Sequence, residues 1–582
     1  MGTNMTRDSV RWARVWAIVL ALALLGAACG DDDGAESSDD TTDTSAPAGE
    51  EADGDTGPVY GGTITVGLEA ESNTWLPGRA QMAFSGHTVV NAIYDPLIAL
   101  NGDGEFEPML AESIEPSDDL SQWTLTLRPD VTFHDGTPLD AETLKWNFDT
   151  LHFHSGSLSW GYLNNAGVQG MTVIDPLTVR YDLAGPNAAF PDILTLPVSW
   201  PVSRAAYEAD PENFGDHPVG TGPFVFEEWV RDGHLSVTRN EDYWGTDEDG
   251  NQLPYLDGIE FRPIPDETSR VQSLVSGDVD VMQSLRGTSI TQVLELEDDG
   301  QVGADLQVGN FSDVVVLNVL QPPLDDVRIR RALALANDPE AAQSVLGVEG
   351  LAEISTGFYG PNSPWYSEAA TDAYPTPDAE EAAALVEEYA SDPARSDGKA
   401  PGDDVVITFN CQPDAALVQL AQLQQSLWQD VGLVVELDQV ESAVNIASVV
   451  GTPATTPPFR GEFSTTCWRS GGGAEPLTTF STFFGPVATN PANFTNFTDP
   501  EIDAQIEILR TSADTDERVA AVEAIGLVAA EALPVLWLTP APSIVGFQNE
   551  VHGLVDWTLP SGSSGTATQS GIPKFHQVYV AR

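Results

Sequence analysis

The chain is poor in basic residues and has no hydrophobic run long enough to cross a membrane. It has 24 Lys and Arg against 89 Asp and Glu, a formal net charge of -65, and its only lysines are Lys145, Lys399 and Lys574. Such a field repels nucleic acids and anionic membrane surfaces, so the composition predicts that the protein does not bind DNA or RNA. Adaptation to a saline habitat and the codon bias of a GC-rich genome explain the acidity equally well.

Signatures of catalysis and of phosphate binding are missing as well. The sequence has no HExxH, no glycine-rich loop ending in Gly-Lys-Ser/Thr and no G-x-S-x-G elbow. The stretch FHDGTP combines His134 and Asp135, but it has no nucleophile beside it and its composition is that of a turn. The sequence therefore predicts a protein that is not an enzyme and needs neither cofactor nor metal.

The N-terminus is predicted to be an export signal that ends in a lipidated cysteine. Three arginines precede an apolar run from Val15 to Leu25, which is too short to span a bilayer, and small residues then lead to Cys29. LLGAAC resembles a bacterial lipobox, with Gly26 where an aliphatic residue is usual. We predict a signal peptide at 1–28 and an extracytoplasmic protein tethered by lipid to the outer face of the cytoplasmic membrane, or periplasmic. The alternative is an ordinary cleaved signal with a chance cysteine.

Residues 29–58 have the composition of a flexible tether. From Gly30 to Pro58 the chain is rich in Asp and Glu, lacks Lys and Arg, and has almost no apolar side chains. Such a segment buries too little apolar surface to offset the entropy lost on ordering.

The first half of the chain is predicted to be β-rich. Alternating β-branched residues predict a strand from Gly61, a hairpin of Trp123–Leu127 with Val131–Phe133, and a helix capped by Asp140. Two further strand pairs are expected, Met171–Ile174 with Thr178–Tyr181 and Phe224–Trp229 with His234–Thr238.

The second half alternates strands and helices. Strands are expected at Val405–Asn410, Val434–Leu437 and Phe463–Trp468, with helices over Ala415–Trp428 and from Glu441. This βαβαβ order predicts a parallel sheet with the first strand between the other two, and ligands of such sheets bind beyond the carboxyl ends of the strands.

Four long stretches resemble one family: Tyr94–Asp149, His217–Gly245, Ser273–Met282 and Leu317–Asp338. They are similar in sequence and spacing to the extracellular solute-binding proteins of ABC importers, in the class that binds oligopeptides, dipeptides or nickel. The resemblance implies a two-lobed α/β fold of the periplasmic-binding-protein type, with a discontinuous, β-rich first lobe.

The same resemblance implies the domain boundaries and the partners. The first lobe would comprise 59–309 and 543–582, and the second 310–542. Two crossing strands near Val314–Val319 and Pro534–Thr539 would form the hinge. The protein would be a monomer that carries a peptide-like or other small polar solute to ABC permease subunits. A secreted hydrolase or a sensor lipoprotein using the same fold is the alternative.

The candidate ligand site is the stretch CWRSGGG, because Trp468 is expected at the carboxyl end of the third strand. Peptide-binding members of the family have Trp-x-x-Asp here, and the acid binds the peptide's ammonium group; in this chain that position is Gly471. Glu475 matches an acidic residue slightly later in the family, displaced by one residue.

Arg469 is a candidate partner for a ligand carboxylate or for the Trp468 ring. Asn73 and Trp75, after the first strand, are added from the opposite lobe. The alternative is that Trp468 only packs and Arg469 points to solvent.

Cys411 and Cys467 are expected at the ends of the first and third strands of the βαβαβ unit. Neighbouring strands lie about 4.8 Å apart, which suits a disulfide in an exported protein. Two buried free thiols are the alternative.

Overall fold

The computed structural model describes residues 57–80, 84–154, 157, 159–308, 311–354, 356–412, 415–450, 461–471, 473–485, 493–567 and 571–581. The predicted signal peptide at 1–28, Cys29 and all but the end of the tether at 29–58 lie outside these residues. The following paragraphs concern the described residues of the unit from Gly57 onward.

The largest sheet has seven strands in the order β12-β18-β11-β1-β10-β9-β8. Their bounds are β1 Thr63–Leu68, β8 Phe224–Val230, β9 His234–Arg239, β10 Gly258–Pro263, β11 Val281–Ser284, β12 Gly303–Gln307 and β18 Ser543–Phe547. Strand β1 runs parallel to β10 and β11, whereas β18 pairs antiparallel with β11 and β12. The sheet thus combines strands from both ends of the chain.

A second antiparallel sheet has the order β4-β5-β7-β6, with β4 Ala111–Pro116, β5 Gln122–Leu127, β6 Val168–Asp175 and β7 Thr178–Leu183. Strand β5 pairs with β4 and β7. The expected hairpin of Trp123–Leu127 with Val131–Phe133 is therefore wrong. The second segment folds on itself, where Thr132 bridges to Pro138 around the FHDGTP turn. The two other expected strand pairs, β6 with β7 and β8 with β9, are confirmed.

Helices and short strands pack around these two sheets. We call the two sheets and these elements together the first lobe. The helices are α2 Phe84–Ile93, α3 Ala141–Asn147, α4 Ser159–Asn165, α5 Phe190–Ile193, α6 Arg204–Ala209, α7 Glu267–Ser276 and α8 Gly287–Asp298, with a π-helical turn η1 Phe148–His152 and 3-10 turns η2 Pro197–Ser199 and η3 Phe214–Asp216. The short strands are β2 Ile98–Leu100, β3 Phe106–Pro108, β19 Val551–His552 and β20 Tyr579–Val580. Asp140 caps α3 as predicted, since its carboxylate accepts from the Thr143 amide.

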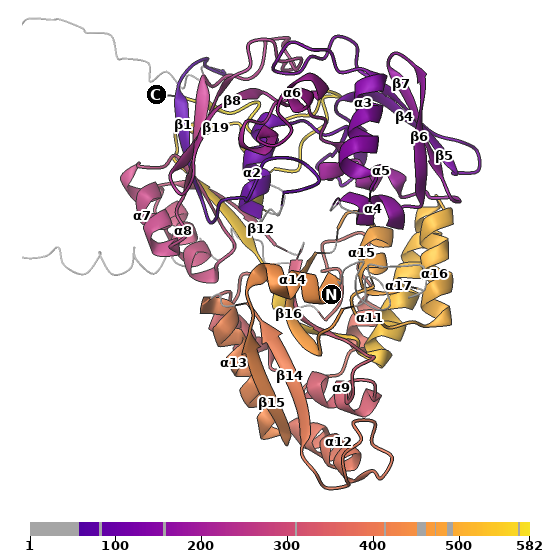
Figure 1. Cartoon of the computed structure of the whole chain (residues 1–582). Coiled ribbons are helices and arrows are strands. Elements are labelled where there is room, and N and C mark those ends of the chain that lie inside the picture. The colour runs from indigo at the N-terminus through magenta and orange to yellow at the C-terminus, as the bar shows by residue number, and fades with distance from the viewer. Residues whose placement is uncertain are drawn as a thin grey trace, which may run out of the picture. The chain divides into compact units, whose positions relative to one another are not determined.

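The second lobe is built on a five-stranded sheet in the order β15-β14-β16-β13-β17 (Figure 1). Its strands are β13 Phe311–Leu317, β14 Val405–Cys411, β15 Leu433–Gln439, β16 Thr465–Gly471 and β17 Val535–Pro540. Strand β14 lies between β15 and β16 and is parallel to both, so the predicted order of the βαβαβ unit is confirmed. The sheet is not parallel throughout, because β13 runs antiparallel to β16 and β17.

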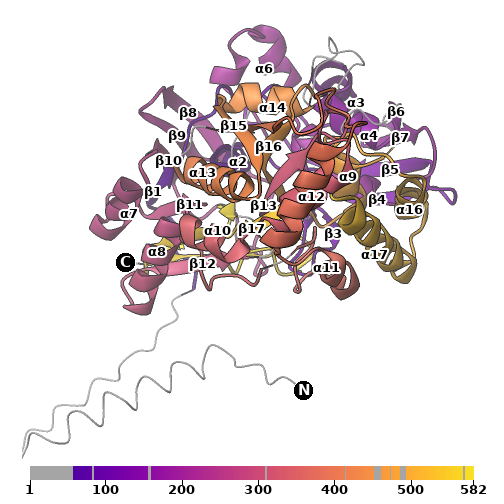
Figure 2. The same ribbon diagram turned by 90° about the horizontal axis from the view of Figure 1, so that it is seen from below.

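The helices of the second lobe are α9 Val327–Leu335, α10 Pro339–Leu346, α11 Glu368–Ala373, α12 Ala379–Ser391, α13 Ala415–Asp430, α14 Ser442–Val450, α15 Pro476–Phe483, α16 Pro500–Thr511 and α17 Thr515–Ala532. Helix α13 packs on β14 and β15 (Figure 1). The ring of its Trp428 lies 5.1 Å from that of Phe409 in β14. Helix α9 lies beside α12 (Figure 2). The largest described apolar cluster surrounds this sheet.

The chain passes between the two large sheets twice, and both connections are short. Strand β12 ends at Gln307 in the first lobe and β13 begins at Phe311 in the second. On the return, β17 ends at Pro540 and β18 begins at Ser543. Because β13 and β17 are paired neighbours, the two crossings leave the second lobe side by side.

Candidate solute-binding site

Trp468 and Arg469 are consecutive in β16, so their side chains leave opposite faces of the sheet. Trp468 shares a face with Thr466, whose hydroxyl donates to Asn445 Oδ1 of α14 at 2.9 Å. Arg469 shares the other face with Cys467. The two side chains therefore belong to opposite surfaces of the sheet.

The indole of Trp468 is half-buried and packs against the ring of Phe494, with centroids 5.3 Å apart and planes at 70°. Phe494 in turn contacts Phe483 at 5.9 Å, and its amide donates to the Thr482 carbonyl at 2.9 Å. Both partners belong to α15. Trp468 thus packs on an apolar neighbour and stays partly exposed. It does not end its strand as expected, because β16 spans Thr465–Gly471 and continues three residues past Trp468, but it does lie one residue beyond the level at which β14 ends.

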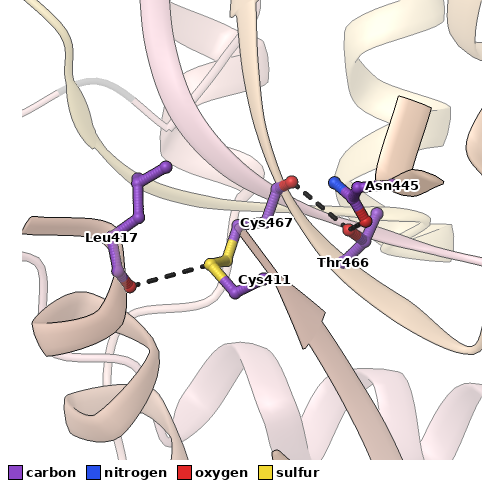
Figure 3. Close-up of a disulfide and its surroundings, with 5 residues drawn as sticks. All are labelled: Cys411, Leu417, Asn445, Thr466 and Cys467. Carbon is purple, nitrogen blue, oxygen red and sulfur yellow. Dashed lines mark hydrogen bonds between the residues drawn. A yellow bond between two sulfur atoms is a disulfide. The ribbon is translucent and has the colours of Figure 1, made fainter. Parts of the chain in front are cut away.

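A disulfide joins Cys411, the last residue of β14, to Cys467 of β16 (Figure 3). Their Cα atoms are 5.1 Å apart, 56 residues separate them in sequence, and both side chains are buried. The Leu417 carbonyl oxygen lies 3.6 Å from Cys411 Sγ (Figure 3). The covalent bond links β14 to β16 at Cys467, the residue before Trp468. It therefore limits how far the Trp468 backbone, and with it the indole, can move.

Arg469 is held by a carboxylate on the neighbouring strand. Its Nε and Nη2 lie 2.9 and 3.0 Å from the two oxygens of Asp313, the residue opposite in β13. The Asp313 side chain is 4% exposed and that of Arg469 is 21% exposed. Such a two-point ion pair fixes the planar guanidinium.

The same ion pair lines a recess of about 310 Å³, part of it open to solvent. Other walls come from Leu285–Gly287 and Pro540–Pro542. Arg469 therefore lies where the chain leaves the second lobe, on the face of β16 opposite Trp468.

Glu475 is the N-cap of α15 and is 3% exposed. Its Oε1 accepts from the Leu477 amide at 2.9 Å and also pairs with Arg518 of α17. Burial raises the pKa of Glu475, while the Arg518 charge lowers it. The carboxylate that was predicted to meet a ligand thus binds the N-terminus of α15 and the Arg518 guanidinium, whose side chain is 11% exposed.

The glycines after Trp468 form the end of β16 and the turn into α15. Gly471 is the last residue of the strand and is paired with Phe311, and Gly472 lies outside the described residues. The Gly473 amide donates to Thr479 Oγ1 at 3.2 Å. The strand end is therefore tied to the first turns of α15.

The two candidates from the first lobe differ in exposure. Trp75 is 1% exposed in that lobe's apolar core, with its ring 5.3 Å from the ring of Trp229. Asn73 is exposed, and its carbonyl accepts from Arg231 at 3.4 Å. The structure does not bring either side chain into a described contact with Trp468.

The lobes meet at a surface that the sequence analysis missed. Thr478 of α15 donates to Asp192 of α5. Arg510 of α16 donates to the Asn165 carbonyl, and the Arg510 carbonyl accepts from the Ala188 amide. Helices α15 and α16 lie next to α4 and α5 in Figure 1. These partners are hundreds of residues apart in sequence, so no local pattern predicts them.

In the part of the chain that is described, no helix is long and apolar enough to cross a membrane, and no group of three metal-binding side chains is found.

Comparison with solved structures shows which fold this chain shares. AgaA from A. tumefaciens R10, in complex with agropinic acid, matches with a TM-score of 0.74 and 24% identity over 90% of this chain and 99% of its own. DppA from Helicobacter pylori, in complex with the peptide STSA, matches with a TM-score of 0.74 and 20% identity over the same shares. The fold is therefore that of the two-lobed periplasmic binding proteins, as predicted.

Sequence comparison identifies the family. The family model for bacterial extracellular solute-binding proteins, family 5, matches residues 105–490. The chain belongs to this family, as the resemblance of its motifs indicated. The glutathione-binding protein GsiB of Salmonella paratyphi A is 30% identical over 299 residues, which cover 51% of this chain. The match spans only 56% of that relative's length.

Proposed function

We propose that this protein captures a peptide-like or other small polar organic solute between its lobes and delivers it to the permease subunits of an ABC importer. Membership of the solute-binding family supports this function. The observation that carries it is the place of Trp468, half-buried in the middle of β16, one residue beyond the level at which the parallel strand β14 ends and next to the disulfide-bonded Cys467. That end of the strands is where such sheets bind ligands.

The lobes in this proposal have the boundaries 59–309 with 543–582, and 310–542. The assignment of β12 and β18 to one sheet and of β13 and β17 to another supports these limits. The hinge in this proposal is formed by the two crossing strands near Val314–Val319 and Pro534–Thr539, which lie largely in the paired strands β13 and β17, because residues at the ends of such elements can absorb the backbone rotation of lobe closure.

The proposed solute contacts are centred on Trp468 and the backbone at Gly471. Arg469 and Glu475 are engaged with Asp313 and Arg518, so we propose that they first position the strand end and α15, and meet solute only if those ion pairs open. Asn73 and Trp75 remain candidates on the facing lobe. Relatives bind glutathione, a peptide and agropinic acid, which makes small polar organic molecules the first solutes to test.

We further propose that Cys29 is lipidated after removal of 1–28 and that 29–58 tethers a monomeric receptor outside the cytoplasmic membrane. The apolar run before Cys29 and the acidic composition after it support this arrangement.

A thermal-shift screen against peptides, glutathione, opine-like conjugates and glycosides tests the function. A ligand at 100 times its Kd stabilises the folded protein by about 2.7 kcal/mol. We expect at least one solute to raise the melting temperature and to be recovered unchanged. Conversion of the solute into product would instead support the secreted hydrolase, and binding without stimulation of uptake in vesicles carrying the permease would support a sensor lipoprotein.

A further inference from the structure

The second lobe contains a pocket whose walls do not include the Trp468 strand. Its volume is about 490 Å³, part of it open to solvent, and small-molecule sites measure roughly 300 to 1,000 Å³. The walls come from Thr356–Tyr359, from helices α11, α15 and α17 and from strand β17, and α11 lies against α17 (Figure 1). The described lining falls wholly within residues 356–537, so it belongs to one lobe. We call this space the α11–α17 pocket.

Aromatic rings form much of the wall of the α11–α17 pocket. Among its described residues, six are aromatic: Phe358, Tyr359, Trp365, Tyr374, Phe480 and Trp537. The ring of Phe358 lies 4.7 Å from that of Trp537 and 5.1 Å from that of Phe480, in both cases edge to face. Rings at such angles present both faces and edges, and a further ring can pack against either. The wall therefore suits a planar aromatic molecule.

The wall offers no charge to a ligand. None of its described residues is Asp, Glu, Lys or Arg. Its hydroxyls bond within the protein, since Thr356 donates to the Thr371 carbonyl and Thr371 to the Ser367 carbonyl, each at 3.1 Å. The Tyr374 hydroxyl accepts from the Trp537 amide at 3.4 Å. A charged group in this pocket would lose hydration without gaining a partner of opposite charge, so the site favours an uncharged ligand.

Contacts within the protein already fix the walls of the pocket. The Trp365 indole donates from Nε1 to the Ala474 carbonyl at 2.9 Å, and the Arg518 guanidinium lies 5.3 Å from its ring centre. Gly526 allows α17 to approach α11, because a Cβ at this position would lie 2.6 Å from the Cβ of Ala370. A ligand would thus meet ordered walls, which reduces the entropy lost on binding.

We propose that the α11–α17 pocket is a second ligand site, which binds an uncharged aromatic molecule of one or two rings. Apolar space inside a protein is poorly hydrated and accepts molecules such as benzene. The site goes beyond the proposed capture of a solute between the lobes, since its described lining includes neither Trp468 nor any residue of the first lobe.

The test uses 2-naphthol, a phenol that is uncharged at pH 7, and the charged analogue 2-naphthoate. Each is titrated by calorimetry into the full chain and into three variants. Ala529→Phe places a ring in the pocket, because Ala529 of α17 lines it. The matched control Ala520→Phe adds the same ring at an exposed position of α17 outside the described lining. Trp468→Ala removes the indole of the candidate solute site.

We expect one 2-naphthol to bind per wild-type chain with a Kd of about 0.1 mM or lower, which is within the ligand efficiency of small molecules. Ala529→Phe should weaken binding at least tenfold, whereas Ala520→Phe and Trp468→Ala should bind as the wild type. The carboxylate of 2-naphthoate finds no partner in the wall, so this analogue should bind at least tenfold more weakly than 2-naphthol. If Ala529→Phe does not fold, Ala529→Leu fills less of the pocket and should weaken binding in the same direction.

Several outcomes would overturn the proposal. They are no saturable binding of 2-naphthol to the wild type, unchanged affinity in a folded Ala529→Phe or Ala529→Leu protein, and equal weakening in Ala520→Phe. Equal affinity for 2-naphthoate would mean that the site does not select uncharged rings. Loss of binding in Trp468→Ala would place the aromatic molecule at the solute site instead. Each of these results leaves the proposed capture of a solute between the lobes standing.

Discussion

Removal of the Cys411–Cys467 disulfide should destabilise the second lobe and loosen the Trp468 strand. The bond closes a loop of 56 residues. In the chain-entropy model, closing a loop of that length lowers the entropy of the unfolded chain and so raises the free energy of unfolding by about 4 kcal/mol at 25 °C. The double variant Cys411→Ala, Cys467→Ala should lose about this amount, plus a smaller contribution from the buried sulfur atoms.

The assay is urea unfolding of the wild type and the double variant, each with and without a thiol reductant. The wild type should unfold at lower urea in reductant, whereas the double variant should be insensitive to it. Peptide mapping after alkylation under denaturing, non-reducing conditions gives the direct control. Alkylation of both Cys411 and Cys467 in the untreated protein would refute the reasoning, since it would mean that the bond does not form.

Three further predictions concern the anchor, acid stability and the α15 cap. Mass spectrometry of the native protein should find a diacylglyceryl adduct on an N-terminal Cys29, and a mature chain that starts after this residue would contradict lipidation. Burial lowers the pKa of His152 to about 3 and of His576 to about 4 from the usual 6.5. The unfolded chain therefore takes up a proton on each ring at a higher pH than the folded protein does. The free energy of unfolding should be unaffected by these rings above pH 6.5 and should decrease as the pH falls from 6.5 toward the folded-state pKa of each ring. For His576 this amounts to about 3 kcal/mol, so the melting temperature of the wild type should fall more between pH 7 and pH 4.5 than that of His576→Gln, and an equal change in the two proteins would exclude it. Glu475→Gln keeps an acceptor for α15 but leaves Arg518 buried without its partner, so urea unfolding should give a loss of about 3 kcal/mol, and a loss below about 0.5 kcal/mol would mean that the ion pair is not needed.

Sequence patterns predicted the elements whose partners are near in the chain. Asp140 caps its helix because a local hydrogen bond decides that position, and the order of β14, β15 and β16 follows from the alternation of strands and helices. Val131–Phe133 looked like a strand because Val and Phe favour extended backbone. It forms no hairpin with Trp123–Leu127, because those residues belong to β5, which pairs instead with β4 and β7.

The site was predictable in part for the same reason. Trp468 and the two cysteines follow from strand order, which local patterns determine. The ion pair of Arg469 with Asp313 depends on β13 running antiparallel to β16, a direction set by the passage between lobes. The contact of Asp192 with Thr478 carries no local signal, since the two residues are 286 positions apart in sequence.

The central claim is that the solute is held at Trp468, and one titration tests it most directly. The tightest-binding member of the solute library is titrated by calorimetry into the wild type, Trp468→Ala, and the control Tyr60→Ala, which removes a 47% exposed ring of the first lobe. We predict that Trp468→Ala weakens binding by about 2 kcal/mol or more, as loss of an aromatic anchor does, and that the control binds as the wild type. Unchanged affinity in a folded Trp468→Ala protein would contradict the account.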